Sequence, residues 1–168
     1  FDSTGTAEQV VSGVVTTDAV ASRINTGAAA PVVFQSAVTV RTLSLNATGT
    51  ASFDDIVTTA TDLNLANGTT VTLTSGIVAG DTVFAATQGA TALAGGSAGA
   101  VVVNLPQTFT SGTITLIDYV GSTTGAVDAA LLTVNSGVLS TYAAAVGSDA
   151  TKLDITATKK SAASIAAA

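Results

Sequence analysis

Carboxylates are the main side chains of this sequence that could do chemistry, because the other reactive types are missing. The 168 residues include no His and no Cys, against eleven Asp and Glu. A Ser-His-Asp or Cys-His nucleophile and the usual zinc and iron ligand sets therefore cannot be built. Asp54 and Asp55 are the only adjacent acids. Glycoside hydrolysis needs two carboxyl groups about 5–9.5 Å apart that face the substrate.

The acidic pair does not extend into a row of carboxylates. Neighbouring residues in a strand point to opposite faces unless a turn reorients them. When successive segments are aligned, the two places held by Asp54 and Asp55 hold Gln35-Ser36 before them and Thr74-Ser75 after them. We therefore interpret the pair as a solvated turn and expect it to have neither a catalytic nor a metal-binding role.

Three other features could indicate a site, and each has a simpler interpretation. Residues 88–100 are rich in Gly and Ala, but they lack the Asp of a calcium-binding repeat and the ending of a phosphate loop, so we expect a loop. Asn46-Ala47-Thr48 and Asn67-Gly68-Thr69 match the N-glycosylation sequon, but both coincide with predicted turns. Aromatic residues are only 4% of the chain, too few for a carbohydrate-stacking platform. The sequence thus predicts no catalytic, cofactor-binding or metal site, no cofactor, and a protein that is not an enzyme.

The overall charge and hydropathy exclude further classes. A net charge of −6 and a pI near 4.1 argue against binding nucleic acid, which requires basic patches. Because 47% of the residues are hydrophobic, the chain does not belong to the intrinsically disordered class. No apolar run approaches the roughly 18–20 residues needed to span a bilayer, so this segment is not expected to span a membrane. The lack of Cys is compatible with export.

Short segments of alternating aliphatic and polar residues indicate half-buried strands. The clearest are residues 38–45, 62–65, 70–74, 113–116 and 152–158. Asn25, Asn46 and Asn67 recur at equal intervals, and each precedes a turn of small residues. Each turn leads to a large apolar residue and then to a second apolar position, in the order Phe34 and Val38, Phe53 and Ile56, Leu73 and Ile77.

A repeat of about 20 residues built from short strands is typical of one coil of a parallel β-helix, an all-β fold in which each coil stacks on the next. A β-sandwich with evenly spaced hairpins is the alternative. We expect residues 1–22 to form an N-terminal strand segment and residues 23–160 to form the solenoid, with a loop near 88–100. We expect residues 161–168 to form an Ala-rich tail that turns helical or frays.

The stretch VTVRTLSLNATGTASFDDIVTTATDLNLANGTTVTLTSG resembles the passenger regions of bacterial autotransporters and related β-strand-repeat surface proteins. The stretches FTSGTITLIDYVG and LLTVNSGVLSTYAAAVGSDATKLDITATKKSA are similar to the last coils of such passengers. This resemblance implies a right-handed parallel β-helix that is exported through the outer membrane and displayed on the bacterial cell surface. The chain departs from the family in being short, because passengers usually have many more coils.

The resemblance and the missing chemistry together predict a non-catalytic extracellular protein with a structural or adhesive role. Its partners would be other copies of itself, adjoining coils of a longer chain, or glycans of a host or cell surface. One alternative is a self-assembling subunit of a surface layer or filament, since the open ends of stacked coils are adhesive edges. A polysaccharide-active β-helix enzyme is a second alternative, which the missing row of acids disfavours.

Overall fold

The computed structural model describes residues 2–3, 8–16, 23–26, 31–45, 49–55, 57–74, 76–86, 101–119, 129–147, 149 and 151–166. These residues are nearly all β and form two sheets. The larger sheet contains β1 (Asp2–Ser3), β3 (Val15–Thr16), β4 (Arg23–Thr26), β6 (Val38–Leu45), β8 (Val57–Leu65), β10 (Thr82–Ala86), β12 (Gly112–Tyr119), β14 (Ser140–Val146) and β15 (Lys152–Lys159). The smaller sheet contains β2 (Gln9–Val11), β5 (Val32–Phe34), β7 (Thr50–Phe53), β9 (Thr70–Leu73), β11 (Val101–Asn104) and β13 (Leu132–Asn135). The described helices are η1 (Ala129–Leu131) and α1 (Ala162–Ala166).

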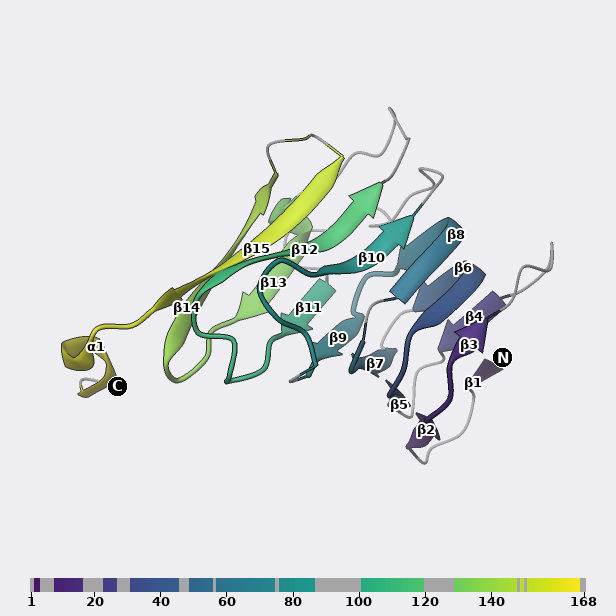
Figure 1. Cartoon of the computed structure of the whole chain (residues 1–168), viewed down its shortest axis with the longest axis horizontal. Coiled ribbons are helices and arrows are strands. Elements are labelled where there is room, and N and C mark those ends of the chain that lie inside the picture. The colour runs from purple at the N-terminus through teal and green to yellow at the C-terminus, as the bar shows by residue number, and fades with distance from the viewer. Residues whose placement is uncertain are drawn as a thin grey trace.

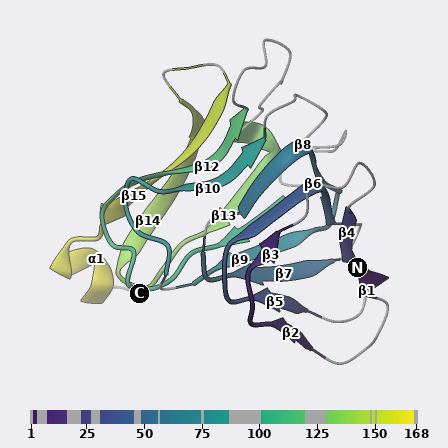
Figure 2. The ribbon, with the colours of Figure 1, turned by 45° about the vertical axis from the view of Figure 1, so that its right-hand side comes forward.

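From β4 to β14 the chain alternates between the two sheets. Neighbouring strands pair in parallel from β2 to β13 in the smaller sheet and from β4 to β12 in the larger one. Figure 1 shows the strands side by side along the long axis, with β1 and α1 at opposite ends, and Figure 2 shows the two layers that they form. This parallel pairing differs from the antiparallel pairing of the β-sandwich alternative.

One hydrophobic core lies between the two sheets. Buried residues alternate with partly exposed ones along β5, β7 and β9, as the alternation of side chains across a strand requires. The rings of Phe34 and Phe53 stack with their centroids 5.2 Å apart, and Phe84 of the larger sheet meets Phe53 edge to face, also at 5.2 Å. Phe53 therefore joins the two layers.

The predicted row of large apolar residues is confirmed, because Phe34 pairs with Phe53 and Phe53 with Leu73 across β5, β7 and β9. The step along the chain between these partners is close to the predicted period. The sequence separation between paired residues increases by more than half later in the sheet. This is so where Val71 of β9 pairs with Val103 of β11, and where Val103 pairs with Val134 of β13. These longer connections explain why the sequence period fades in the second half of the chain.

The predicted row of turn asparagines is wrong at Asn25. This residue lies within β4 and pairs with Ser44 of β6, which in turn pairs with Asn64 of β8. Asn67 instead lies in the turn after β8, and Asn46 is outside the described residues. The equal spacing of the three asparagines therefore aligned Asn25, which lies in a strand, with Asn67, which lies in a turn. This happened because the sequence separation between paired residues of β4, β6 and β8 is slightly shorter than the spacing of the asparagines.

The second apolar position of the repeat also needs correction. Val38 pairs with Val57, and Val57 pairs with Phe84 rather than lying in a row with Ile77. Ile77 is buried in the connection between β9 and β10, and Ile56 is outside the described residues. The connection between β9 and β10 is long, so the residue at the repeat spacing lies before β10 begins.

The strict alternation predicted for residues 38–45 is interrupted within β6. Val38 and Val40 are buried, as are Leu43 and Leu45, but the residues between these pairs are both partly exposed. The register between β6 and β8 shifts at the same place. A β-bulge accommodates such a change of phase by adding one residue to one strand, and it bends the sheet.

The C-terminal part of the larger sheet is antiparallel, which corrects the expectation of parallel coils to residue 160. β15 pairs antiparallel with both β12 and β14. The connection between β14 and β15 is too short for the crossover that parallel strands require, so the two form a hairpin. Within the Ala-rich tail, Ala162–Ala166 form the short helix α1. Among the described helices, none has the length and apolar character to cross a membrane.

Candidate functional site

The acidic pair lies where the chain leaves β7. The backbone N–H of Asp54 donates to the carbonyl of Phe34 (2.9 Å), and the N–H of Thr74 donates to the carbonyl of Phe53 (3.1 Å). Asp54 and Thr74 are thus neighbours at the ends of the paired strands β7 and β9, as the sequence alignment predicted, and the Thr74 hydroxyl donates to the Asp54 carboxylate. Asp55 is exposed.

A hydroxyl, and not a second carboxylate, is therefore the partner of Asp54. The two-acid arrangement of a glycosidase is not formed at this column of residues. Within the described ranges, no group of three or more His, Cys, Asp and Glu side chains gathers at one place. The hydrogen bond from Thr74 to Asp54 links the end of β7 to the end of β9, and a carboxylate acceptor strengthens such a bond.

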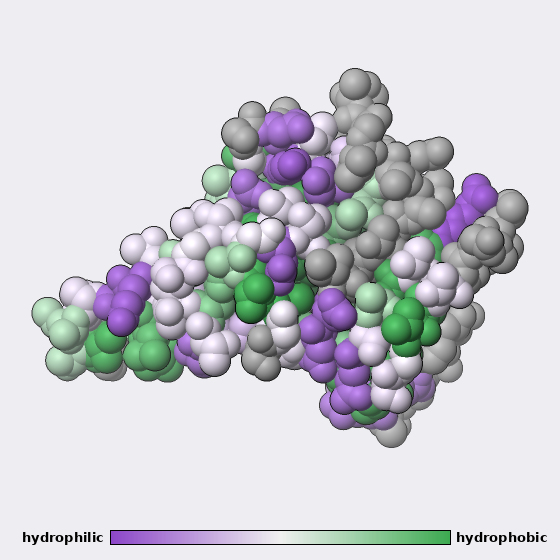
Figure 3. Space-filling model, viewed as in Figure 1, coloured by the Kyte–Doolittle hydropathy of each residue, from purple (hydrophilic) through white to green (hydrophobic). Residues whose placement is uncertain are grey.

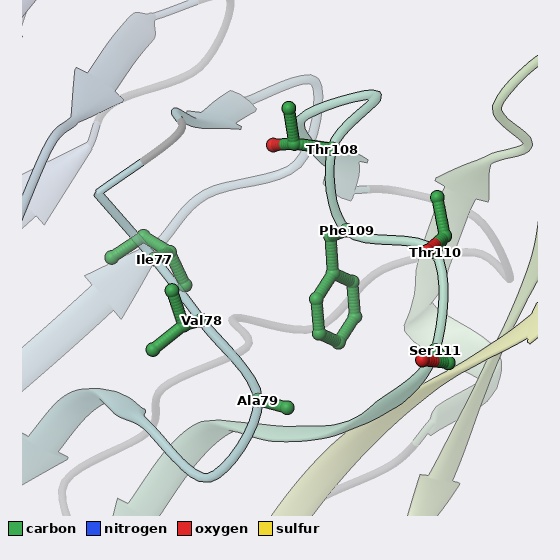
Figure 4. Close-up of a pocket in the computed structure, with 7 residues that line it drawn as sticks. All are labelled: Ile77, Val78, Ala79, Thr108, Phe109, Thr110 and Ser111. Atoms are coloured by element: carbon green, nitrogen blue, oxygen red, sulfur yellow. The ribbon is translucent and has the colours of Figure 1, made fainter.

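A groove of ≈ 240 Å³ opens between two loops that lead into β10 and β12. Ile77, Val78 and Ala79 line one side, and residues 108–111 line the other (Figure 4). Phe109 is nearly buried, with 5% of its surface exposed, whereas Val78 is 57% exposed. The groove therefore has an apolar floor and one open apolar wall.

Backbone hydrogen bonds hold the two loops together. The N–H of Gly80 donates to the carbonyl of Thr113 (2.8 Å), and the N–H of Thr115 donates to the carbonyl of Asp81 (2.8 Å). The Asp81 carboxylate also accepts from the N–H of Val78 (2.7 Å). Gly112 has a φ of +99°, and a Cβ there would lie 2.7 Å from the Cβ of Ala79. Gly112 thus permits the close approach that forms the groove.

The C-terminal hairpin supports the groove from behind. Tyr142 of β14 stacks on Phe109 with ring centroids 6.3 Å apart, and its hydroxyl donates to the carbonyl of Phe109 (3.0 Å). Burial raises the pKa of Tyr142 above its usual 10.0, and a hydrogen bond with Ser140 offsets part of this increase. Ser140 is itself buried and donates to the carbonyl of Thr110 (3.3 Å).

The chemistry that the groove can supply is limited to contact and hydrogen bonding. Its polar side chains are the hydroxyls of Thr108, Thr110 and Ser111, and none of its seven lining residues is charged. Such a surface can shelter a small uncharged group, but it lacks an acid, a base or an activated nucleophile. Sequence reasoning missed this groove because its two walls, residues 77–79 and 108–111, lie far apart in the chain.

Polar ladders cross the strands on the outside of both sheets. In the smaller sheet Asn135 donates to Asn104 (2.7 Å), and Asn104 donates to Thr72 (3.3 Å). In the larger sheet Thr115 donates to the carboxylate of Asp154 (2.8 Å). The face in Figure 3 accordingly has much pale surface, the colour of residues of intermediate hydropathy, with separate green and purple patches. These ladders link neighbouring strands, and stacked amides of this kind stabilise parallel strands.

Two sequence-predicted features lie outside the described residues, namely the Gly/Ala-rich stretch 88–100 and the sequon at 46–48. The second sequon is described: Asn67 is exposed, whereas Thr69 is fully buried and donates through its hydroxyl to the carbonyl of Leu45 (3.2 Å). Comparisons with protein-family models, with curated proteins and with solved structures found no match for this chain.

Proposed function

We propose that this chain is a non-catalytic structural part of an extracellular cell-surface protein, built as a right-handed β-solenoid and resembling an autotransporter passenger. The observation that carries the proposal is the continuous internal row of Phe34, Phe53 and Leu73 in parallel strands. In such a stack each coil buries its inner face only against its neighbours. Right-handed winding agrees with the strong preference of connections between parallel strands.

The surface of the chain supports a structural role over a catalytic one. Outer polar side chains of the described strands bond to the next strand, as in the row of Thr72, Asn104 and Asn135. With a net charge of −6 the stack also resists non-specific association with acidic surfaces. A stiff, weakly reactive rod can hold other parts of a protein away from a cell.

Labelling of intact cells that produce the chain tests the proposal. Antibodies raised against the folded chain should stain unbroken cells, and protease added outside should remove the stain. A signal that develops only after the cells are lysed would contradict surface display. A screen for turnover of acidic polysaccharides tests the non-catalytic part, and activity that Asp54→Ala abolishes would overturn it.

Self-assembly is a second candidate function, which the exposed strand edges favour. β2 forms one edge of the smaller sheet and β13 the other. Val10 of β2 and Val14, which follows the strand, are 53% and 69% exposed. Unpaired edge strands with apolar side chains are templates for a further strand. Copies could therefore join head to tail, with β2 of one copy beside β13 of the next.

Electron microscopy and sedimentation at increasing concentration test this second candidate. The chain should form regular fibres or sheets, and the double variant Val10→Lys/Val14→Lys should remain monomeric because charged edges resist pairing. Val78→Lys is the matched control, since Val78 is similarly exposed (57%) but lies away from this edge. Monodisperse monomers of the unaltered chain would exclude self-assembly.

A further inference from the structure

The turn that joins β8 to β9 contains the only Asn-Gly pair of the sequence, Asn67-Gly68. The N–H of Thr69 donates to the carbonyl of Ala66 (3.2 Å), which closes a tight turn. Gly68 has a φ of +86°, the conformation that the third residue of a type II turn requires. Both central residues are exposed to water.

The residues on either side of this pair are held by the preceding coil. The N–H of Ala66 donates to the carbonyl of Leu45 (2.9 Å), and the N–H of Thr70 donates to the carbonyl of Gly49 (2.9 Å). The buried hydroxyl of Thr69 adds a third contact. Among the hydrogen bonds of the described residues, none uses the N–H of Gly68. The Asn67 side chain and the Gly68 nitrogen therefore lie together on an exposed turn whose flanking residues are held by hydrogen bonds.

We propose that Asn67 is a site of spontaneous deamidation in the folded chain, with water as the only co-reactant. The Gly68 nitrogen forms a bond to the side-chain carbonyl carbon of Asn67, and the bond from that carbon to Nδ2 breaks. Ammonia leaves with the proton from the Gly68 nitrogen, and a five-membered imide remains. Water then opens the ring at either carbonyl, which yields aspartate or isoaspartate at position 67. Glycine favours the attack because it has no Cβ to obstruct the nitrogen.

The modification changes both the charge and the backbone of this turn. Either product adds one negative charge to a chain that already carries −6. Isoaspartate also adds one main-chain carbon between β8 and β9. β9 pairs with both β7 and β11, so a lengthened connection strains the register of three neighbouring strands. Isoaspartate at position 67 would therefore loosen the pairing of β9 with its two neighbours.

Other asparagines of the chain serve as internal comparisons. Asn64 and Asn104 lie in β8 and β11 and are each followed by Leu, whose side chain hinders the attack. Asn135 is exposed and followed by Ser136, but its side-chain nitrogen donates to Asn104 (2.7 Å). We expect the folded chain to modify Asn67 several-fold faster than Asn135, with no product at Asn64.

Peptide mapping after incubation of the folded chain at mildly alkaline pH tests the proposal. Cleavage before Asp releases residues 62–80, a peptide that contains both Asn64 and Asn67. Aspartate at position 67 creates a new cleavage site, whereas isoaspartate does not and is detected by enzymatic methylation. Asn67→Gln should lose both products, since its longer side chain would have to close a six-membered ring.

Circular dichroism during the incubation checks that the chain remains folded. Product at Asn67 in the folded chain, with much less at Asn135, supports the proposal. Product at Asn67 only after unfolding in urea would overturn it, because the turn would then protect the pair. Equal rates at Asn67 and Asn135 would also overturn it.

Discussion

Replacement of Phe53 by Ala tests whether the aromatic row holds the two sheets together. Phe53 is fully buried, and its ring contacts Phe34 in the same sheet and Phe84 in the opposite one. Truncation of a buried Phe removes its burial and leaves a cavity, which together cost about 3 to 5 kcal/mol. We expect the free energy of unfolding to fall by this amount, because a close-packed core relaxes only partly into the space that the ring leaves.

A second variant separates the ring contacts from the volume. Phe53→Leu keeps much of the buried volume but loses both ring pairs, each of which contributes about 0.5–1.5 kcal/mol. The expected loss is therefore about 1–3 kcal/mol. A double-mutant cycle with Phe34→Leu should show a coupling of about 0.5–1.5 kcal/mol for the stacked pair.

Urea unfolding followed by circular dichroism measures these changes. Val138→Ala is the control, since Val138 is 67% exposed and its truncation should change the stability by no more than about 0.5 kcal/mol. A loss for Phe53→Ala as small as that of the control would refute the reasoning. Zero coupling between Phe34 and Phe53 would refute the stacked row while leaving the burial intact.

Three further predictions concern the C-terminal half. Tyr142→Phe should remove a loss of stability at alkaline pH. Because the pKa of Tyr142 is raised in the folded chain, the neutral phenol stabilises the fold below pH 10.0, and this contribution is lost as the pH rises through the folded-state pKa. Urea midpoints measured at several pH values test this. Gly112→Ala should cost about 1–3 kcal/mol because of its φ of +99° and the nearby Ala79, whereas Gly13→Ala, with nothing within 4 Å, should be neutral in the same denaturation assay. Lys152→Ala should cost less than about 1 kcal/mol in thermal unfolding, since the ion pair with Asp118 is partly exposed, and a larger cost would show that the pair is better shielded than its exposure indicates.

Local patterns in the sequence were sufficient to predict the strands and much of the core. Alternation placed β9 and β15 close to their observed bounds, and the row of Phe34, Phe53 and Leu73 followed from repeat spacing. Strand β14 was not predicted, because STYAAAV lacks the aliphatic residues that mark a buried face. Most of its residues are exposed because β14 lies at the edge of the sheet, where only β15 pairs with it.

For the candidate sites too, the sequence was sufficient for one feature and the tertiary structure was needed for the other. The sequence was sufficient to predict that Asp54 has no second carboxylate beside it, because the repeat aligned Thr74 with Asp54. The groove between Ile77 and Phe109 and the support from Tyr142 required the tertiary structure. Those residues belong to segments that lie far apart in the sequence, and no local pattern records which loops meet.

The sequence by itself determined that this protein is β-rich, acidic and without the residues for His- or Cys-based chemistry. These properties depend on composition and on short-range alternation of side chains, which act over short stretches of chain. Only the tertiary structure decided the parallel register, the length of each connection between paired strands and the antiparallel hairpin formed by β14 and β15. The reason is that strand pairing depends on long-range contacts, and connections of very different length return the chain to a neighbouring strand, as from Phe34 to Phe53 and from Val71 to Val103.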